Sequence, residues 1–114
     1  MLSPIYRWQD SDVWNFIRKN NLSYCRLYDE GYRRIGCIFC PMSSVKNKVR
    51  DRRRYPGVER AIKRSIQYLI DTNGYMERFH ATADEIFDWW VSNLPADQYF
   101  ATLRLQQKID FDIL

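Results

Sequence analysis

The chain has 114 residues, 46% of them hydrophobic, with four Gly and four Pro, which excludes a disordered or collagen-like polymer and predicts a single small domain over residues 1–114. Its 18 Lys and Arg residues against 14 Asp and Glu give a net charge of +4, which is only mildly basic. No apolar run reaches the roughly 18 residues of a membrane helix, and the first residues lack the features of a signal peptide. We therefore expect a cytoplasmic protein with no membrane partner.

The first part of the chain is expected to contain one helix followed by an irregular loop. Apolar residues at helical spacing predict a helix over residues 10–20, with Asp10 or Ser11 as its N-cap. Residues 22–44 show no sustained period and contain Gly, Pro, Tyr, Cys and Arg, so they predict a structured loop with a short strand over residues 34–38. A loop of this kind usually needs something to hold it, and a bound metal is one such means.

The second part of the chain is expected to be helical throughout. A short basic helix is predicted over residues 44–54, and the clearest amphipathic pattern predicts a longer helix over residues 56–73. Thr82 and Glu85 form a capping box that opens a further helix, which ends before the next proline, and residues 97–107 predict the last helix. The fold class is therefore mostly α, a small helical domain with an irregular loop that contains the cysteines.

Three cysteines are the candidate metal ligands. Cys37 and Cys40 are separated by two residues, a spacing at which both thiolates can reach one ion, and eleven residues separate Cys25 from Cys37. A tetrahedral zinc site or a four-iron cluster needs a fourth donor, which is His80 or a residue outside this chain. The alternative is a reduced dithiol without metal, and for His80 a place at a helix start or in the core is favoured over ligation.

Basic residues are concentrated in a short basic belt, residues 46–54, with Arg33 and Arg34 upstream of it. Arginine forks match phosphate and sulfate oxygens, so the belt is a candidate anion site, although it is equally consistent with a solvated helix face. Nucleic acid is a further candidate partner, because Lys and Arg neutralise phosphates and nearby tyrosines can stack on bases. No Walker or dinucleotide loop and no catalytic triad is present, which argues against a self-contained hydrolase.

Several motifs in fixed order resemble the C-terminal part of the phosphoadenosine phosphosulfate (PAPS) reductase family. They cover roughly residues 3–42. In sequence they are Ser3-Pro4-Ile5-Tyr6-Arg7-Trp8, Asp12-Val13-Trp14, Leu27-Tyr28-Asp29-x-Gly31-Tyr32 and Ile35-Gly36. Cys37-x-x-Cys40, directly after Gly36, is similar to the iron-sulfur adenylylsulfate reductases and to sulfur-transfer enzymes of DNA phosphorothioation. The Ser-Gly-Gly-x-Asp-Ser phosphate loop of the family and its Glu-Cys-Gly-x-His tail are not in the sequence.

The resemblance implies that the chain is the C-terminal module of a larger α/β nucleotide-binding enzyme whose N-terminal domain is absent here. It implies that Cys25, Cys37 and Cys40 hold an iron-sulfur cluster or zinc with an upstream fourth donor. It also implies that Gly31, Arg33 and Arg34 face the sulfate or phosphates of an adenine nucleotide. Two residues of the basic belt are the further candidates for substrate binding, Lys46 and Arg50.

Two functions from different classes follow from these features. The first is part of a PAPS reductase-like oxidoreductase or sulfur-transfer enzyme, not catalytic alone, acting on an adenylylated sulfur compound or in nucleotide-activated sulfur transfer. The second is a stand-alone, zinc-stabilised module that binds nucleic acid or another anion through the basic belt. A salt-dependent shift of nucleic acid by the purified domain would favour the second.

Overall fold

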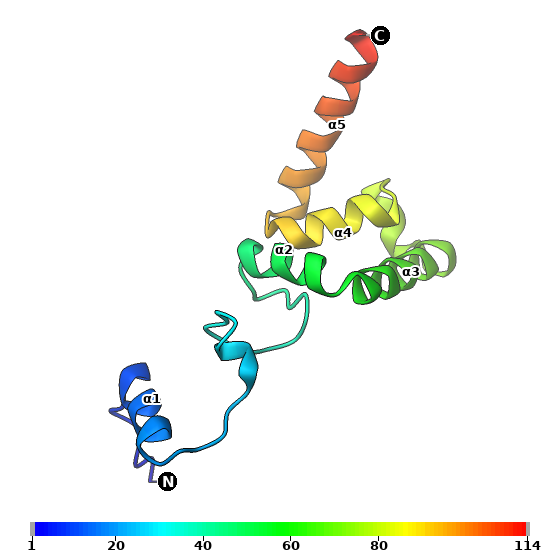
Figure 1. The fold of residues 1–114 in the computed structure, drawn as a ribbon. Coiled ribbons are helices and arrows are strands. Elements are labelled where there is room, and N and C mark those ends of the chain that lie inside the picture. The colour runs from blue at the N-terminus through cyan, green and yellow to red at the C-terminus, as the bar shows by residue number, and fades with distance from the viewer. Residues whose placement is uncertain (1, 114) are drawn as a thin grey trace. The chain divides into compact units, whose positions relative to one another are not determined.

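The computed structural model describes residues 2–113, without the side chains of residues 75 and 76. Its contacts divide the chain into two compact units, a first unit, Met1–Ile35, and a second unit, Gly36–Leu114. Over the described residues the chain forms helices and no strand, which confirms the mostly α fold class (Figure 1). The prediction that all 114 residues form one domain stays a prediction.

The short strand predicted over residues 34–38 is wrong. These residues adopt bends and irregular backbone, and no strand forms anywhere in residues 2–113. The physical reason is that a single extended segment needs a partner strand to satisfy its backbone groups, and helices occupy the remaining regular parts of the chain.

The first unit is built around helix α1, Asp10–Lys19, and a 3-10 turn, η1, Arg26–Tyr28. The N-cap of α1 is Gln9 rather than the predicted Asp10 or Ser11, and the backbone N–H of Gln9 donates to the Asp12 carboxylate at 2.8 Å. No described side chain of this unit is fully buried. A segment of this size has too much surface for its volume to enclose a core of its own.

The second unit contains the hydrophobic core. Its elements are α2 (Val45–Arg54), α3 (Pro56–Thr72), η2 (Gly74–Phe79), α4 (Ala83–Ser92) and α5 (Ala96–Ile113). The buried apolar side chains are Phe39, Ile86, Phe87, Val91 and Phe100. The apolar face predicted for α3 packs against Phe39, Phe87 and Val91, through Val58, Ile62 and Ile66. Figure 1 shows α3 beside α4, with α5 running away from the end of α4.

The helix ends of the second unit follow local capping chemistry. Ser44 Oγ accepts from the N–H of Asn47 at 3.3 Å and begins α2, as predicted. The capping box of Thr82 and Glu85 is confirmed, with bonds of 2.9 and 3.2 Å. Helix α4 ends earlier than predicted, because Asn93 adopts a left-handed conformation with φ 59° that stops the helix. Helix α5 runs well past the predicted end, residue 107, to Ile113.

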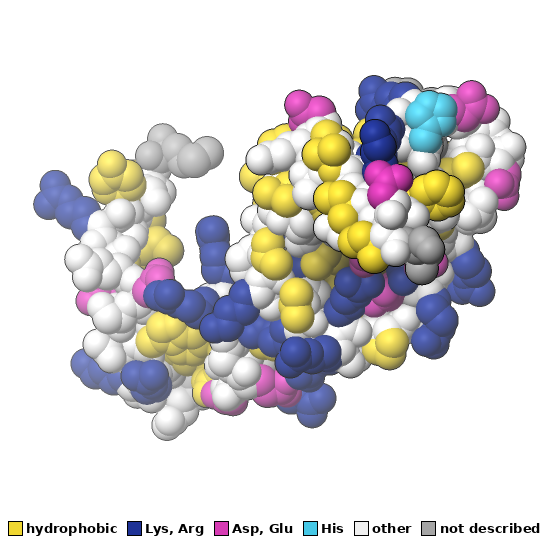
Figure 2. Space-filling model, turned by 90° about the horizontal axis from the view of Figure 1, so that it is seen from above, with side chains coloured by type: hydrophobic (Ala, Val, Ile, Leu, Met, Phe, Trp, Pro, Cys, Tyr) yellow, Lys and Arg dark blue, Asp and Glu magenta, His cyan; other side chains and the backbone are white. Residues whose placement is uncertain are grey.

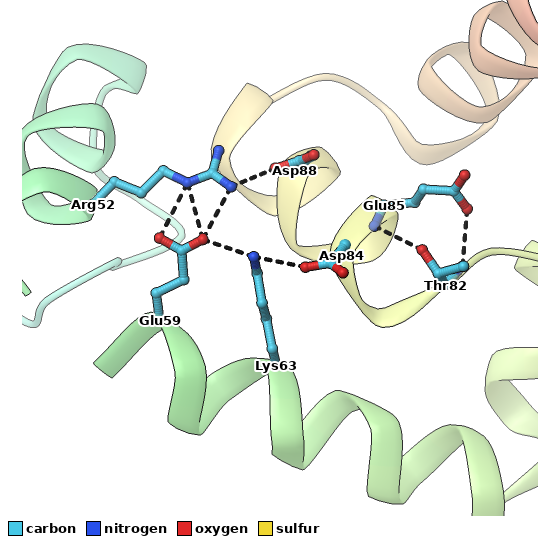
Figure 3. Close-up of polar contacts among 7 residues, drawn as sticks. All are labelled: Arg52, Glu59, Lys63, Thr82, Asp84, Glu85 and Asp88. Carbon is cyan, nitrogen blue, oxygen red and sulfur yellow. Dashed lines mark hydrogen bonds and ion pairs between the residues drawn. The ribbon is translucent and has the colours of Figure 1, made fainter. Parts of the chain in front are cut away.

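An ion-pair network links three helices of the second unit (Figure 3). Arg52 of α2 contacts Glu59 of α3 at 3.0 Å and Asp88 of α4 at 2.7 Å. Lys63 of α3 contacts Glu59 at 2.8 Å and Asp84 of α4 at 2.7 Å. Burial raises the pKa of Glu59, but hydrogen bonds from Arg52 and Lys63 outweigh it and place the pKa below its ordinary value.

This network predicts an acid-dependent loss of stability. Because the pKa of Glu59 is lower in the folded protein than in the unfolded chain, the folded state binds fewer protons between the two values. The stabilisation is complete above the unfolded pKa of about 4.3 and is lost as pH falls through the folded pKa. We expect Glu59→Gln to make the free energy of unfolding less dependent on pH below about 4.3, as measured by urea denaturation at a series of pH values. Glu77→Gln, at an exposed position, is the control, and equal pH dependence in both variants would contradict the prediction.

Candidate functional site

The first unit contains a pocket of about 410 Å³ that brings together two of the predicted substrate residues, Gly31 and Arg33. A second pocket of about 730 Å³ shares Arg33 with it and adds Arg34. The three residues that the PAPS reductase resemblance singled out therefore line one connected, solvent-open region. All lining residues of both pockets belong to the first unit.

Aromatic side chains form one wall of this pocket. Trp14 of α1 meets Tyr24 at a ring-centroid distance of 5.2 Å and Tyr28 at 5.0 Å, edge to face in both cases. The hydroxyl of Tyr24 donates to Asp29 Oδ1 at 2.7 Å, and this hydrogen bond raises the pKa of Tyr24. The bond ties the chain before η1 to the chain after it, so the aromatic wall is held at both ends.

Gly31 has a conformational role in this turn. Its φ of +91° lies in the left-handed region, which an L side chain rarely adopts, while a Cβ built there would meet nothing within 4 Å. Its N–H donates to Tyr28 O at 3.2 Å, and the next residue, Tyr32, donates to Leu27 O at 3.2 Å. The glycine is therefore required to reverse the chain rather than to make room for a ligand, and the reversal carries Arg33 to the pocket.

Arg18 is a pocket residue that the sequence patterns did not single out. It lines the pocket together with Arg33, opposite in charge to two acidic lining residues, Asp10 and Asp29. Asp10, Trp14 and Arg18 are spaced four residues apart on α1, which places them on one helix face. That spacing was the signal that could have found it. The pocket thus offers flat aromatic surface beside two guanidinium groups, which suits a planar ring that carries an anionic group.

The cysteines are divided between the two units. All three are free thiols; Cys25 is in the first unit, whereas Cys37 and Cys40 are in the second. The N–H of Cys40 donates to Cys37 O at 3.2 Å, which closes a turn that presents both thiols from one short segment. Among the described residues no three His, Cys, Asp or Glu side chains gather as a metal site. The turn fits half of a tetrahedral sulfur site, and the metal prediction stays a prediction.

His80 lies in the second unit, between η2 and α4. Its side chain is exposed, which fits the expected place before a helix and not a place in the core. Its backbone has φ 44°, and its N–H donates to Glu77 O at 3.0 Å.

The basic belt is divided between two faces of α2. Lys48 and Asp51, three residues apart, are only 1% and 6% exposed and face the core, and Arg52 beside them is held in the ion-pair network. Lys46 and Arg53 are exposed. The belt is therefore not one anion surface, since the helical period turns part of it inward. On the face of the molecule that Figure 2 draws, Lys and Arg side chains are interleaved with apolar and acidic ones.

Arg50, the other belt residue predicted to bind substrate, is half-buried and donates to Asn47 Oδ1 at 3.2 Å. Lys48, in contrast, donates to the carbonyl oxygens of Pro41 at 3.4 Å and Trp90 at 2.9 Å, and to Asn93 Oδ1. Burial lowers the pKa of Lys48, whereas the charge of Cys40 raises it. Lys48 of α2 therefore has a structural role, because it binds the backbone of the loop that carries the cysteine pair.

The first part of the chain is similar to known proteins. Residues 1–43 match the family model of the phosphoadenosine phosphosulfate reductase domain. An uncharacterised protein of Methanocaldococcus jannaschii is 42% identical over 53 residues, which are 46% of this chain and 13% of that protein. The adenosine 5'-phosphosulfate reductase of Oceanobacillus iheyensis is 51% identical over 37 residues, 32% of this chain and 15% of the reductase. Adenosine 5'-phosphosulfate reductase 2 of Bacillus subtilis is 42% identical over 43 residues, 38% of this chain and 18% of the reductase.

These matches show that residues 1–43 are a region of the PAPS reductase family, as the motifs predicted. The relatives with a named activity are adenosine 5'-phosphosulfate reductases, so the region is of a kind found in enzymes of sulfur metabolism. The alignments cover 13–18% of the length of these relatives. No solved structure matches significantly.

The match runs through the first unit and past the Cys37–Cys40 turn, and it stops before α2. Helices α2 to α5 therefore lie outside the residues that the family model matches, whereas the 53-residue alignment with the Methanocaldococcus jannaschii protein extends beyond residue 43. Over residues 2–113 no helix combines the length and the apolar character needed to cross a membrane.

Proposed function

We propose that this chain is the C-terminal part of a PAPS reductase-like enzyme that acts on an adenylylated sulfur compound or transfers nucleotide-activated sulfur. The observation that carries the proposal is the pocket of the first unit, which lies within the family region and brings Gly31 and Arg33 together with an aromatic wall. The remaining length of the relatives leaves room for a nucleotide-binding domain that would complete the site.

Each pocket residue has a role in this proposal. Trp14 and Tyr28 contact the adenine ring, because aromatic faces bind flat π-systems without strict sequence or ring preference. Arg18 and Arg33 bind the sulfate or phosphate oxygens through charge-assisted hydrogen bonds, and Arg34 lies beside them. Lys46 and Arg50 of α2 stay proposed as further basic residues for the substrate.

Cys37 and Cys40 would hold an iron-sulfur cluster or a zinc ion, with Cys25 as a third ligand and a fourth from outside this chain. The turn that joins Cys37 and Cys40 and the exposure of Cys37 support two of these ligands. When bound, such a group would fix the loop that carries the pair, in keeping with the resemblance to the iron-sulfur reductases.

The pocket proposal is tested by titrating the chain with adenosine 5'-phosphosulfate and following the binding isotherm by calorimetry. We expect Arg33→Met and Arg18→Met each to weaken binding tenfold or more, since a hydrogen bond to a charged group contributes about 1.5–3 kcal/mol. Adenosine without phosphate should bind more weakly than adenosine 5'-phosphosulfate. The control is Arg64→Met, which removes an equal charge from an exposed site on α3.

The proposal would be contradicted if both arginine variants bound adenosine 5'-phosphosulfate as tightly as the unaltered chain does. It would also be contradicted if adenosine bound as tightly as adenosine 5'-phosphosulfate.

The nucleic-acid-binding module is the second candidate function, because Lys46 and Arg53 are exposed on α2. Binding of a single-stranded oligonucleotide that falls steeply with salt, and that Arg33→Met does not change, would favour this second function.

A further inference from the structure

The loop of residues 37–43, which we term the cysteine loop, is held from two sides by side chains of the second unit. From α2, Asp51 Oδ2 accepts from the N–H of Phe39 at 3.0 Å, and Lys48 Nζ donates to Pro41 O at 3.4 Å. From the end of α4, the indole N–H of Trp90 donates to Phe39 O at 2.8 Å. The amide of Asn93, just beyond α4, donates to Ser43 O at 2.8 Å. Alternate residues of the loop are thus each bound through their backbone.

Phe39 locks the loop to the core between the two cysteines. Its side chain is 2% exposed and meets the ring of Phe87 at 5.2 Å, edge to face. Its φ of 55° is left-handed, which a Phe adopts only where the surrounding contacts over-determine it. The backbone conformation of the loop around Phe39 is therefore fixed before any ligand binds. Cys37 and Cys40 lie on a preformed turn.

Lys48 brings a positive charge into this framework. It is 1% exposed, and the hydrogen-bond acceptors around it are neutral, namely two carbonyl oxygens and the amide oxygen of Asn93. A buried ammonium is costly unless a negative charge compensates it. Its three hydrogen bonds to these acceptors offset part of that cost and tie its position to the Pro41 carbonyl.

We propose that Lys48 is a positioning residue for the Cys37–Cys40 pair, because it fixes the cysteine loop through the Pro41 carbonyl. The inference rests on the proposed function of the pair as metal ligands. It also assigns a role to α2 and α4, because Lys48, Asp51 and Trp90 lie on these helices, beyond the residues that the family model matches. The helical unit then serves as the scaffold of the cysteine pair.

The test is a cobalt titration of the metal-free chain under reducing, oxygen-free conditions, followed by the thiolate-to-cobalt charge-transfer band in the near ultraviolet. We expect Lys48→Met to weaken cobalt binding about tenfold or more, the range found when groups supporting metal ligands are removed. Arg64→Met, with the same charge change on exposed α3, should bind cobalt as the unaltered chain does. Hydrogen exchange of the metal-free chain should show faster exchange in the cysteine loop of Lys48→Met and unchanged exchange in α3.

A second variant covers the case in which Lys48→Met loses helical content. Asn93→Gly keeps the left-handed conformation at the end of α4 and removes the amide that contacts Lys48 and Ser43. It should weaken cobalt binding at unchanged helical content. Cobalt affinity and loop exchange equal to those of the unaltered chain in a folded variant would overturn the role of Lys48. A chain without the charge-transfer band before any substitution would overturn the metal proposal instead, and the exchange measurement would still decide whether Lys48 holds the loop.

Discussion

Replacing Phe39 with alanine is expected to lower the free energy of unfolding of the second unit by about 3–5 kcal/mol, the usual cost of truncating a buried aromatic side chain. The residue is 2% exposed and packs on Phe87 at the centre of the core, although it belongs to a loop. The truncation would leave a cavity between the cysteine loop and α4. Urea denaturation followed by circular dichroism measures the effect.

Ile38→Ala is the matched control for this prediction. Ile38 is the neighbouring residue in the cysteine loop and is 39% exposed, so its truncation should change stability by about 0.5 kcal/mol or less. Similar losses in the two variants would show that the loop is not anchored through Phe39. A loss below about 1 kcal/mol for Phe39→Ala would contradict its place at the centre of the core.

The second large effect is expected from the cysteine pair. Chain purified without oxygen should carry zinc, or iron with sulfide and a broad visible absorption band, and Cys37→Ser and Cys40→Ser should each lose most of it. A tetrahedral site that loses a thiolate loses one of its four bonds, and serine is a poor replacement for soft metals. The measurement is the metal and sulfide content of the three proteins. Circular dichroism checks that their helical content is unchanged.

The metal content of the purified chain separates the two functions. Iron with sulfide would place the chain with cluster-bearing sulfur enzymes, whereas one zinc per chain would favour a structural site and raise the binding-module alternative. Absence of both metals, with unchanged folding of the variants, would contradict the metal site. Cys25→Ser in the same series asks whether the thiol of the first unit takes part.

The family match ends at residue 43, whereas the boundary between the two units lies between Ile35 and Gly36. The match covers the first unit with its pocket and ends just after the cysteine pair, while the core that anchors the pair comes from residues beyond the match. Phe39 belongs to both parts, since it lies within the matched residues and at the centre of the helical core. The helical core therefore includes a residue of the family region, and the cysteine loop is where the matched and unmatched parts of the chain pack together.

Several elements could be read from the sequence because local chemistry decides them. Ser44, Pro56 and the pair Thr82 and Glu85 mark helix starts, and each satisfies or removes backbone N–H groups within a few residues of itself. The apolar spacing of α3 predicted a buried face for the same reason, since a helical period is a local property. The motifs of residues 3–42 predicted the family region directly.

The burial of Lys48 and the anchoring of the cysteine loop could not be read from the sequence. Lys48 contacts Trp90 and Asn93, which lie more than forty residues away along the chain, and no local rule distinguishes an inward lysine from its exposed neighbours in a basic run. The sequence by itself determined where the α-helices lie, the N-caps at Ser44 and Thr82 and the family region, because these depend on neighbours in the chain. Only the tertiary structure decided which charges face the core and which residues hold the cysteine pair, because those contacts depend on segments that fold against one another.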